Sequence, residues 1–335
     1  MQAEAFLKSK KVLNEEYRPV YLNFKVYFPI KKKISEIEKI NGYVERVNED
    51  FFPRKPRRVY SLSELEKLYN IQLPKSVSIL GDIILLNEIP DKADEKTVGE
   101  IIRSNFGARA VFLKIKETSG DFRIANWKLI AGFGDTFTVH HENNFYFALD
   151  PSKVFFNPRM GSERNRVINA TNSNETVLDM FAGVGPFSLP IAKKCAKVFA
   201  IDINPNAVQF MKINLKLNKV PAEKISILCG DAAKIAPKLE RKADRVIMNY
   251  PEKAIDFITH AIQSIKLEGG IIHLYTFIRA KNKKNAIYLA KKELDNKIRN
   301  HVQTYKILWT GASREVAPRK YMVILDILMK PKFIN

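Results

Sequence analysis

Short apolar runs, each ending in a polar residue, recur through the second half of the chain. Four such runs and the polar residues that follow them are Thr176–Leu178 with Asp179, Lys197–Ile201 with Asp202, Ile225–Cys229 with Asp231, and Arg245–Met248 with Asn249. Runs of this length bounded by turn residues are typical of buried strands in a parallel sheet. Because the carboxyl ends of parallel strands meet at one edge, we expect the four polar side chains to line one ligand crevice.

A glycine-rich turn follows the first of these runs. Its sequence is Ala182-Gly183-Val184-Gly185, and Pro186 is suited to the first position of a following helix. Glycines there let a ligand approach the backbone closely. Asp202 follows about 20 residues later, where a carboxylate accepts hydrogen bonds from ribose hydroxyls. One glycine pair is not the full dinucleotide fingerprint, so S-adenosylmethionine is the better ligand. Any single Asp after a strand can equally be a helix cap.

These patterns predict an α/β protein with a Rossmann-like, S-adenosylmethionine-binding domain after two smaller N-terminal α+β domains. The expected parts are a small domain over 1–50, a basic linker over 51–58, a middle domain over 59–150 and the cofactor-binding domain over 151–335. Within the middle domain we expect helices over Ser61–Tyr69 and Glu95–Phe106, with strands inside Ser76–Asn87 and over Ala110–Ile115.

Positive charge is concentrated on the cofactor-binding domain and the linker. The chain has 56 Lys and Arg against 36 Asp and Glu, a net charge of +20. Residues 151–335 carry 32 of the cations and 15 of the acids, and 51–58 carry four cations and no acid. A basic surface beside a cofactor crevice favours a polyanionic substrate, nucleic acid first. The other interpretation is lysines that only aid solubility, as in Lys281–Lys284.

No sequence feature points to a membrane, a secretory pathway or a metal. There is no signal peptide, no apolar run long enough to span a bilayer and no H-E-x-x-H motif. His260 and His273 fall in expected core elements rather than in a ligand set. We therefore expect a soluble, cytoplasmic, metal-free protein, acting as a monomer.

Taken together, four motifs resemble the archaeal and eukaryotic tRNA (guanine-N1)-methyltransferases. They read F-F-N-P-R-x-G-S-E-R, D-M-F-A-G-V-G-P-F-S, A-I-D-I-N-P and N-Y-P. The resemblance implies that residues 151–335 form a class I methyltransferase domain with S-adenosylmethionine as cofactor. It also implies tRNA as partner, with the anticodon stem-loop bound and the elbow as a further contact. It implies methylation of N1 of the guanosine at position 37, 3′ to the anticodon.

The resemblance also implies roles for individual residues. Glu163 matches the general base that takes the proton from guanine N1, Arg123 the arginine that meets O6, and Asn249 the residue that holds the target base. The residues implied to contact the substrate are Arg123, Arg159, Asn249 and Pro251. Those implied to contact the cofactor are Phe155, Arg164, Asp179, Phe181, Gly183, Val184, Gly185, Pro186, Asp202, Ile203, Asp231, Ala232 and Asn249.

The chain departs from the family pattern in three places. Phe155 stands where similar enzymes have tyrosine, so one hydroxyl is missing. Ile124–Trp127 replaces a charged stretch after Arg123, and the N-terminal domain is short, which leaves elbow recognition open. Two alternatives remain: a wyosine-pathway enzyme that transfers an aminocarboxypropyl group or methylates a tricyclic guanosine, and a non-catalytic RNA-binding protein.

Overall fold

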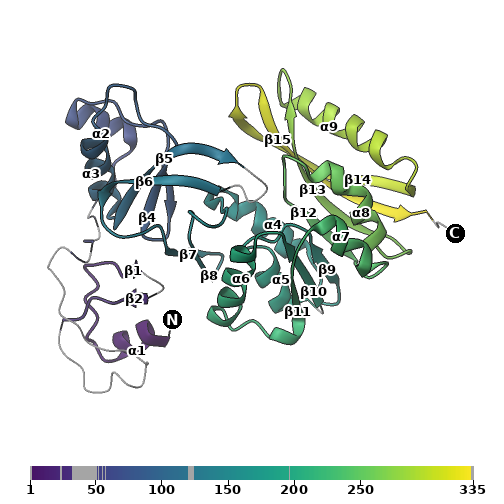
Figure 1. Cartoon of the computed structure of the whole chain (residues 1–335), viewed down its shortest axis with the longest axis horizontal. Coiled ribbons are helices and arrows are strands. Elements are labelled where there is room, and N and C mark those ends of the chain that lie inside the picture. The colour runs from purple at the N-terminus through teal and green to yellow at the C-terminus, as the bar shows by residue number, and fades with distance from the viewer. Residues whose placement is uncertain are drawn as a thin grey trace. The chain divides into compact units, whose positions relative to one another are not determined.

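The computed structural model describes residues 2–22, 25–31, 51, 53–54, 56, 58–119, 124–195 and 197–332 (Figure 1). The chain divides into two compact units: Met1–Glu142 with Ala148–Arg159, and Asn143–Phe147 with Met160–Asn335. The strands β7 (Thr138–Glu142) and β8 (Phe145–Leu149) form a two-stranded sheet.

The first unit contains a four-stranded sheet with strand order β3-β4-β5-β6. Its strands and helices are β3 (Ser78–Leu80), β4 (Ile83–Leu86), β5 (Ala110–Ser119), β6 (Ile124–Gly132), α2 (Leu62–Tyr69) and α3 (Glu95–Phe106). β4 and β5 run parallel and are joined by α3, because a parallel pair needs a crossover. Val98 and Ile102 of α3 pack with Ile84 and Val111 of the sheet in one apolar core.

Both predicted helices of this unit are confirmed, and their first residues have clear causes. Ser61 caps α2 in a capping box, because its side chain accepts from the Glu64 N–H while Glu64 accepts from the Ser61 N–H. Asp94 accepts from the Thr97 N–H at 2.8 Å and starts α3. Asn70 and Gly107 end the two helices in the left-handed conformation.

The described part of the predicted basic linker packs against the N-terminal segment. This segment contains α1 (Gln2–Ser9) and the antiparallel pair β1 (Val20–Leu22) and β2 (Lys25–Tyr27). Arg54 forms a β-bridge with Tyr17, and its guanidinium lies 5.6 Å from that ring centre. The stretch is therefore anchored, while the domain boundaries at residues 50 and 58 stay a prediction.

The second unit is organised around a seven-stranded sheet of order β11-β10-β9-β12-β13-β15-β14. Its strands are β9 (Thr176–Asp179), β10 (Lys197–Asp202), β11 (Ile225–Cys229), β12 (Arg245–Met248), β13 (Gly270–Arg279), β14 (Val302–Ala317) and β15 (Lys320–Pro331). The first five in this order run parallel, and β15 and β14 are antiparallel to their neighbours. The four predicted strands and the α/β class are confirmed.

Helices cover this sheet and complete its core. They are α4 (Gly161–Ala170), α5 (Ser188–Lys194), α6 (Pro205–Leu217), α7 (Ala232–Ile235), α8 (Ile258–Ser264) and α9 (Lys283–Ile298). Short 3-10 turns lie at Pro158–Met160, Ala222–Lys224, Ala236–Leu239 and Ala254–Phe257. Ile258 of α8 and Leu294 of α9 are fully buried with Ile272 and Leu325 of the sheet, which fixes the strand edge that carries the site.

The predicted start of the helix after the glycine turn is wrong by two residues. Helix α5 begins at Ser188, not at Pro186. Phe187 is its N-cap residue, and the Leu189 N–H donates to the Gly185 carbonyl in the turn that leads into the helix. Pro186 therefore lies in the turn before the helix, where its ring fixes the backbone without losing a helical donor.

Candidate active site

The four polar residues predicted at the strand ends do lie at one edge of the sheet of the second unit. Asp179 pairs in register with Ala200 of β10 and Ile247 of β12, and Asp202 pairs with Cys229 of β11. Asp231 and Asn249 follow β11 and β12 within two residues. Since these strands are parallel, their ends open on the same side, as in nucleotide-binding α/β sheets.

The glycine turn at this edge leaves room for a ligand at one of its glycines only. Gly183 has φ of +56°, and a Cβ added there would meet no described atom within 4 Å. Gly185 has φ of +90°, and an added Cβ would come within 2.8 Å of Leu189 and 2.9 Å of Met211. Gly183 thus exposes backbone to the crevice, whereas Gly185 lets the turn pack on the core.

Asp202 holds the turn in place. Its Oδ2 accepts from the Gly183 N–H at 2.7 Å, and its Oδ1 accepts from the Asn204 N–H at 2.9 Å. Burial raises the pKa of Asp202, and the two backbone donors oppose that shift. Each carboxylate oxygen has a second lone pair, so Asp202 can still accept from the two hydroxyls of a ribose.

Asp179 lies beneath the turn with one oxygen unsatisfied. Its side chain is fully buried, and Oδ2 accepts from the Ser188 hydroxyl at 2.6 Å. Oδ1 has no hydrogen-bond partner among the described residues. Burial raises the pKa of Asp179 from 3.8 to about 7. An orphaned buried acceptor of this kind fits a cofactor that carries a positively charged or N–H donor group.

Polar and apolar groups suited to an adenine ring surround the same edge. Asp231 caps α7 by accepting from the Ala233 N–H at 2.9 Å, which leaves its other oxygen for an exocyclic amine. Ile203, directly after Asp202, is 43% exposed and offers an apolar surface for a ring. Phe181 packs against the rings of Tyr250 and Phe257, each with centroids 5.2 Å away. Ala232 is buried beside Asp231.

Glu163, the predicted base, lies in the first turn of α4. Arg166, one turn later, donates to both of its oxygens at 2.9 and 2.8 Å, and the Tyr275 hydroxyl donates to Oε1 at 2.8 Å. Arg164 is buried in the same helix. The Asn249 side-chain amide lies 4.0 Å from the Met160 sulfur, at the start of α4. The predicted base and the predicted base-holding residue therefore belong to one unit.

The remaining predicted residues do not all lie at this edge of the sheet. Pro251 follows Asn249, and its carbonyl accepts from the Phe277 N–H at 2.9 Å. Phe155 and Arg159 belong to the first unit: Phe155 is 41% exposed, and Arg159 donates to the Ser76 hydroxyl at 3.1 Å. Arg123 lies outside the described residues. The remaining cofactor predictions, Val184 and Pro186, are in the glycine turn, where Val184 is buried.

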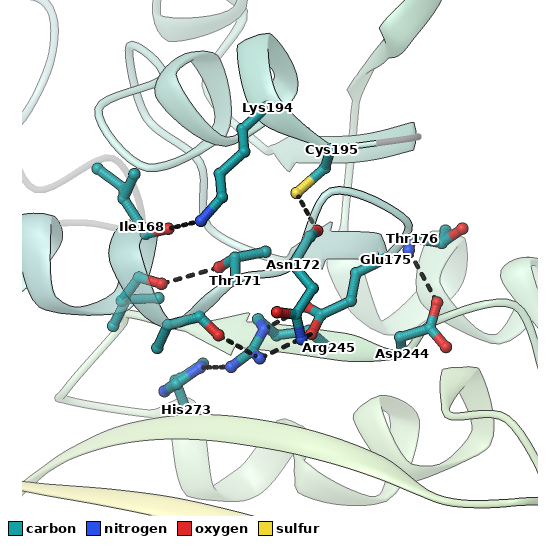
Figure 2. A network of polar contacts seen from close by, with 12 residues as sticks. Ile168, Thr171, Asn172, Glu175, Thr176, Lys194, Cys195, Asp244, Arg245 and His273 are labelled. Atoms are coloured by element: carbon teal, nitrogen blue, oxygen red, sulfur yellow. Dashed lines mark hydrogen bonds and ion pairs between the residues drawn. The ribbon is translucent and has the colours of Figure 1, made fainter.

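Sequence reasoning missed a buried polar network that adjoins Glu163. Its members beyond Glu163 are Arg166, Glu175, Arg245, His273, Tyr275 and Asp326. Figure 2 shows the part around Arg245, which donates to Glu175 and lies against His273. The prediction that His273 is a core residue is confirmed, since only 1% of it is exposed. The one signal in the sequence was the spacing of Glu163 and Arg166, one helical turn apart.

The described residues contain neither a metal-binding cluster nor a membrane-spanning helix. No three His, Cys, Asp or Glu side chains are grouped so that they could bind a metal ion. Nor does any described helix combine the length and the apolar character that a membrane crossing needs.

Comparison with known proteins gives matches along most of the chain. The family described as the TRM5/TYW2 methyltransferase domain matches residues 138–305, and the TYW2 N-terminal domain matches residues 61–136. The tRNA (guanine(37)-N(1))-methyltransferase Trm5b of Methanocaldococcus jannaschii is 34% identical over 99% of this chain and 96% of its own length.

Two further matches bear on substrate and reaction. The tRNA(Phe) (4-demethylwyosine(37)-C(7)) aminocarboxypropyltransferase of Pyrococcus horikoshii is 32% identical over 81% of this chain and 95% of its own length. A solved structure described as the complex of aTrm5 and tRNALeu is 33% identical, with a TM-score of 0.69, and the match covers 98% of this chain and 96% of that one. The predicted fold and family are confirmed: this chain belongs to the TRM5/TYW2 methyltransferase family.

Proposed function

We propose that this protein transfers a methyl group from S-adenosylmethionine to N1 of guanosine 37 in tRNA, as a monomer in the cytoplasm that binds the anticodon stem-loop. The observation that carries the proposal is the presence, in one unit, of a glycine turn clamped by Asp202 and a carboxylate, Glu163, held by Arg166 and Tyr275. The first part suits a nucleoside cofactor, and the second suits a base for proton abstraction.

The residues at the sheet edge fit S-adenosylmethionine. Gly183 supplies open backbone, Asp202 acceptors for the ribose, Ile203 an apolar surface for adenine, and Asp231 an acceptor for its amine. The orphaned Oδ1 of Asp179 supports a charged donor nearby. Bound there, the cofactor supplies an electrophilic methyl group on a positively charged sulfur, a chemistry that needs no metal.

The chain's own task is to make guanine N1 a nucleophile. N1 carries a proton, which passes to the Glu163 carboxylate as the N1 electron pair forms the bond to the methyl carbon. The bond between sulfur and the methyl carbon breaks, and its electron pair stays on sulfur. General-base assistance of this kind is worth roughly 10²–10⁴-fold. Negative charge grows on O6 meanwhile, and a donor placed there, the role expected of Arg123, stabilises it. Asn249 is the residue expected to hold the base edge.

Exposed cations at the same edge support an RNA substrate. They follow the end of β13 and lie on the β14–β15 hairpin: Arg279, Lys281, Lys283, Lys284, Arg314 and Arg319. The two segments are adjacent, because the Ala280 N–H donates to the Arg319 carbonyl at 2.8 Å. A groove among them is lined by three cations and one carboxylate, Lys283, Lys284, Arg314 and Glu315, together with Asn282 and Tyr321. Such a surface suits the phosphates of RNA, which position the substrate without reading its sequence.

Aminocarboxypropyl transfer on a wyosine intermediate is the second candidate. It is favoured by the match of residues 61–136 to a TYW2 N-terminal domain and by the 32% identity to an enzyme of that activity. Methyl transfer to guanosine is favoured by the longer match to Trm5b, which covers 99% of this chain against 81% for the aminocarboxypropyltransferase. The intact carboxylates Glu163, Asp202 and Asp231 argue against a purely RNA-binding protein.

Analysis of the product distinguishes these candidates. The purified protein is incubated with S-adenosylmethionine and unmodified tRNA, and the digested nucleosides are identified by mass spectrometry. We expect 1-methylguanosine, absent when position 37 is changed to adenosine. An aminocarboxypropylated nucleoside formed from tRNA that carries the tricyclic precursor, without 1-methylguanosine from plain tRNA, would establish the second candidate. If calorimetry detects no cofactor binding and neither tRNA yields a modified nucleoside, only RNA binding would remain.

A further inference from the structure

One guanidinium in the second unit joins two carboxylates from distant parts of the chain. Arg166 donates to Glu163 through Nε at 2.9 Å and NH2 at 2.8 Å. It also donates to Asp326 of β15, through NH1 at 2.6 Å and NH2 at 3.1 Å. Two pairs of hydrogen bonds in one plane fix the orientation of a guanidinium, which a lysine ammonium cannot reproduce.

An aromatic ring also stacks on the guanidinium of Arg166. Its guanidinium carbon lies 3.9 Å from the ring centre of Trp309 on β14, within stacking distance. Trp309 is opposite Asp326 in the pairing of β14 with β15, so the ring and the carboxylate come from neighbouring strands. Burial lowers the pKa of Arg166. The hydrogen bonds to Glu163 and Asp326 outweigh burial, so the pKa is raised above its usual value. Arg166 is therefore a fixed positive charge.

A further hydrogen bond, from His273, fixes the Asp326 carboxylate. Its Oδ1 accepts from His273 Nδ1 at 2.7 Å, and His273 Nε2 lies 2.6 Å from Arg245 NH1, which can only donate. These partners assign His273 as the neutral tautomer with the proton on Nδ1. Burial lowers the pKa of His273, which agrees with a neutral ring. Arg245 is in turn paired with Glu175 at 2.6 and 3.0 Å (Figure 2).

The donors occupy the two oxygens of Glu163 unequally. Oε1 accepts both from Arg166 NH2 and from the Tyr275 hydroxyl, which fills its two lone pairs. Among the described residues, Oε2 accepts from Arg166 Nε alone, so one lone pair of Oε2 is open. Burial and the neighbouring Glu163 raise the pKa of Tyr275 well above its usual value, so its hydroxyl keeps its proton and stays a donor. The Glu163 side chain is 15% exposed.

We propose that Arg166 is a positioning residue that, with Tyr275, turns Glu163 so that the open lone pair of Oε2 receives the proton from guanine N1. This inference rests on the proposed function, because it gives Glu163 the role of base. Asp326, His273 and Trp309 hold Arg166 against the thermal rotation that would release Glu163. The geometry matters because a misplacement of about 1 Å at a reacting group can cost roughly 10²-fold in rate.

The central test is Arg166→Lys, which keeps the charge and loses the double fork. We expect the single-turnover rate of methyl transfer to fall by about 10–100-fold, with Kd for cofactor and tRNA within about 3-fold of wild type. Tyr275→Phe, which removes a single hydroxyl, should slow the same step by about 3–10-fold. In Arg166→Ala, added methylguanidinium should restore part of the lost rate, which a purely structural role does not predict.

Arg109→Lys is the control. Arg109 is a buried guanidinium that donates to Asp82 and to the Phe133 and Phe137 carbonyls, and it belongs to the first unit rather than to the network around Glu163. Its substitution should lower the melting temperature while the single-turnover rate stays within about 3-fold of wild type. Equal slowing by Arg166→Lys and Arg109→Lys at equal loss of melting temperature would overturn the positioning role. So would a folded Arg166→Ala protein that methylguanidinium does not rescue.

Glu163→Gln separates this inference from the proposed function. If Glu163→Gln is slow and Arg166→Lys reacts at the wild-type rate, the positioning role is refuted and the role of Glu163 as base stands. If Glu163→Gln reacts at the wild-type rate, the base assignment itself fails, and the inference about Arg166 fails with it.

Discussion

Changing Asp202 to Asn tests where the cofactor lies. In the wild type the two carboxylate oxygens accept from two N–H groups, Gly183 at 2.7 Å and Asn204 at 2.9 Å. An Asn side chain has one oxygen and one NH2, so one of these N–H groups would face a donor. The NH2 also cannot accept from a ribose hydroxyl.

The expected loss of cofactor affinity follows from these contacts. Hydrogen bonds to a charged group contribute about 1.5–3 kcal/mol each, and one such bond to the cofactor is removed. We therefore expect Kd for S-adenosylmethionine, measured by calorimetry at neutral pH, to rise by about 10–100-fold. Asp256→Asn is the control, since that carboxylate is exposed and pairs with Lys297. Affinity within about 2-fold of wild type, in a variant with an unchanged melting temperature, would refute this placement of the cofactor.

Three further predictions concern the same unit. Burial raises the pKa of Asp179 to about 7. As the pH rises from about 4 to 7, the folded state therefore keeps a proton that the unfolded chain releases, and the free energy of unfolding should fall. Asp179→Asn should reduce that fall, by at most about 4 kcal/mol, in denaturant titrations at several pH values, and an unchanged pH profile would contradict it. Gly185→Ala should lower the free energy of unfolding by roughly 1–3 kcal/mol through its clash with Leu189. Gly183→Ala should instead weaken cofactor binding more than it lowers stability. Equal losses of stability in the two variants would contradict this difference between the two glycines. Neutralising Lys283, Lys284 and Arg314 together should lower the slope of log Kd for tRNA against log salt by roughly 2–3. The control variant neutralises Lys212, Lys216 and Lys219 instead. Equal effects of the two variants on the slope would show that the groove does not contact RNA.

The strand ends could be predicted from the sequence because burial sets them. A parallel strand between two layers of helices must be apolar along its length, so the first polar residue marks its end, as at Asp179 and Asn249. The start of α5 was misplaced because Pro186 suits both a turn and a first helical turn. The backbone of Phe187, which is the N-cap residue of α5, distinguishes the two.

The network around Glu163 could not be predicted from local pattern. Tyr275 lies 112 residues from Glu163 in the chain, and Asp326 lies 160 residues from Arg166. A tyrosine or an aspartate within an apolar strand is equally a core residue or an edge residue on sequence grounds. The pairing of β13 with β15 determines which residues meet in the network, because it sets His273 opposite Asp326.

The most direct test of the proposed function is single-turnover methyl transfer to position 37 by wild type and Glu163→Gln in parallel. The amide keeps the shape of the side chain and its place in α4 but cannot take the proton from N1. We predict a rate lower by at least roughly 10²-fold for Glu163→Gln, with cofactor and tRNA affinity nearly unchanged. A Glu163→Gln protein that methylates guanosine 37 at close to the wild-type rate would contradict the account.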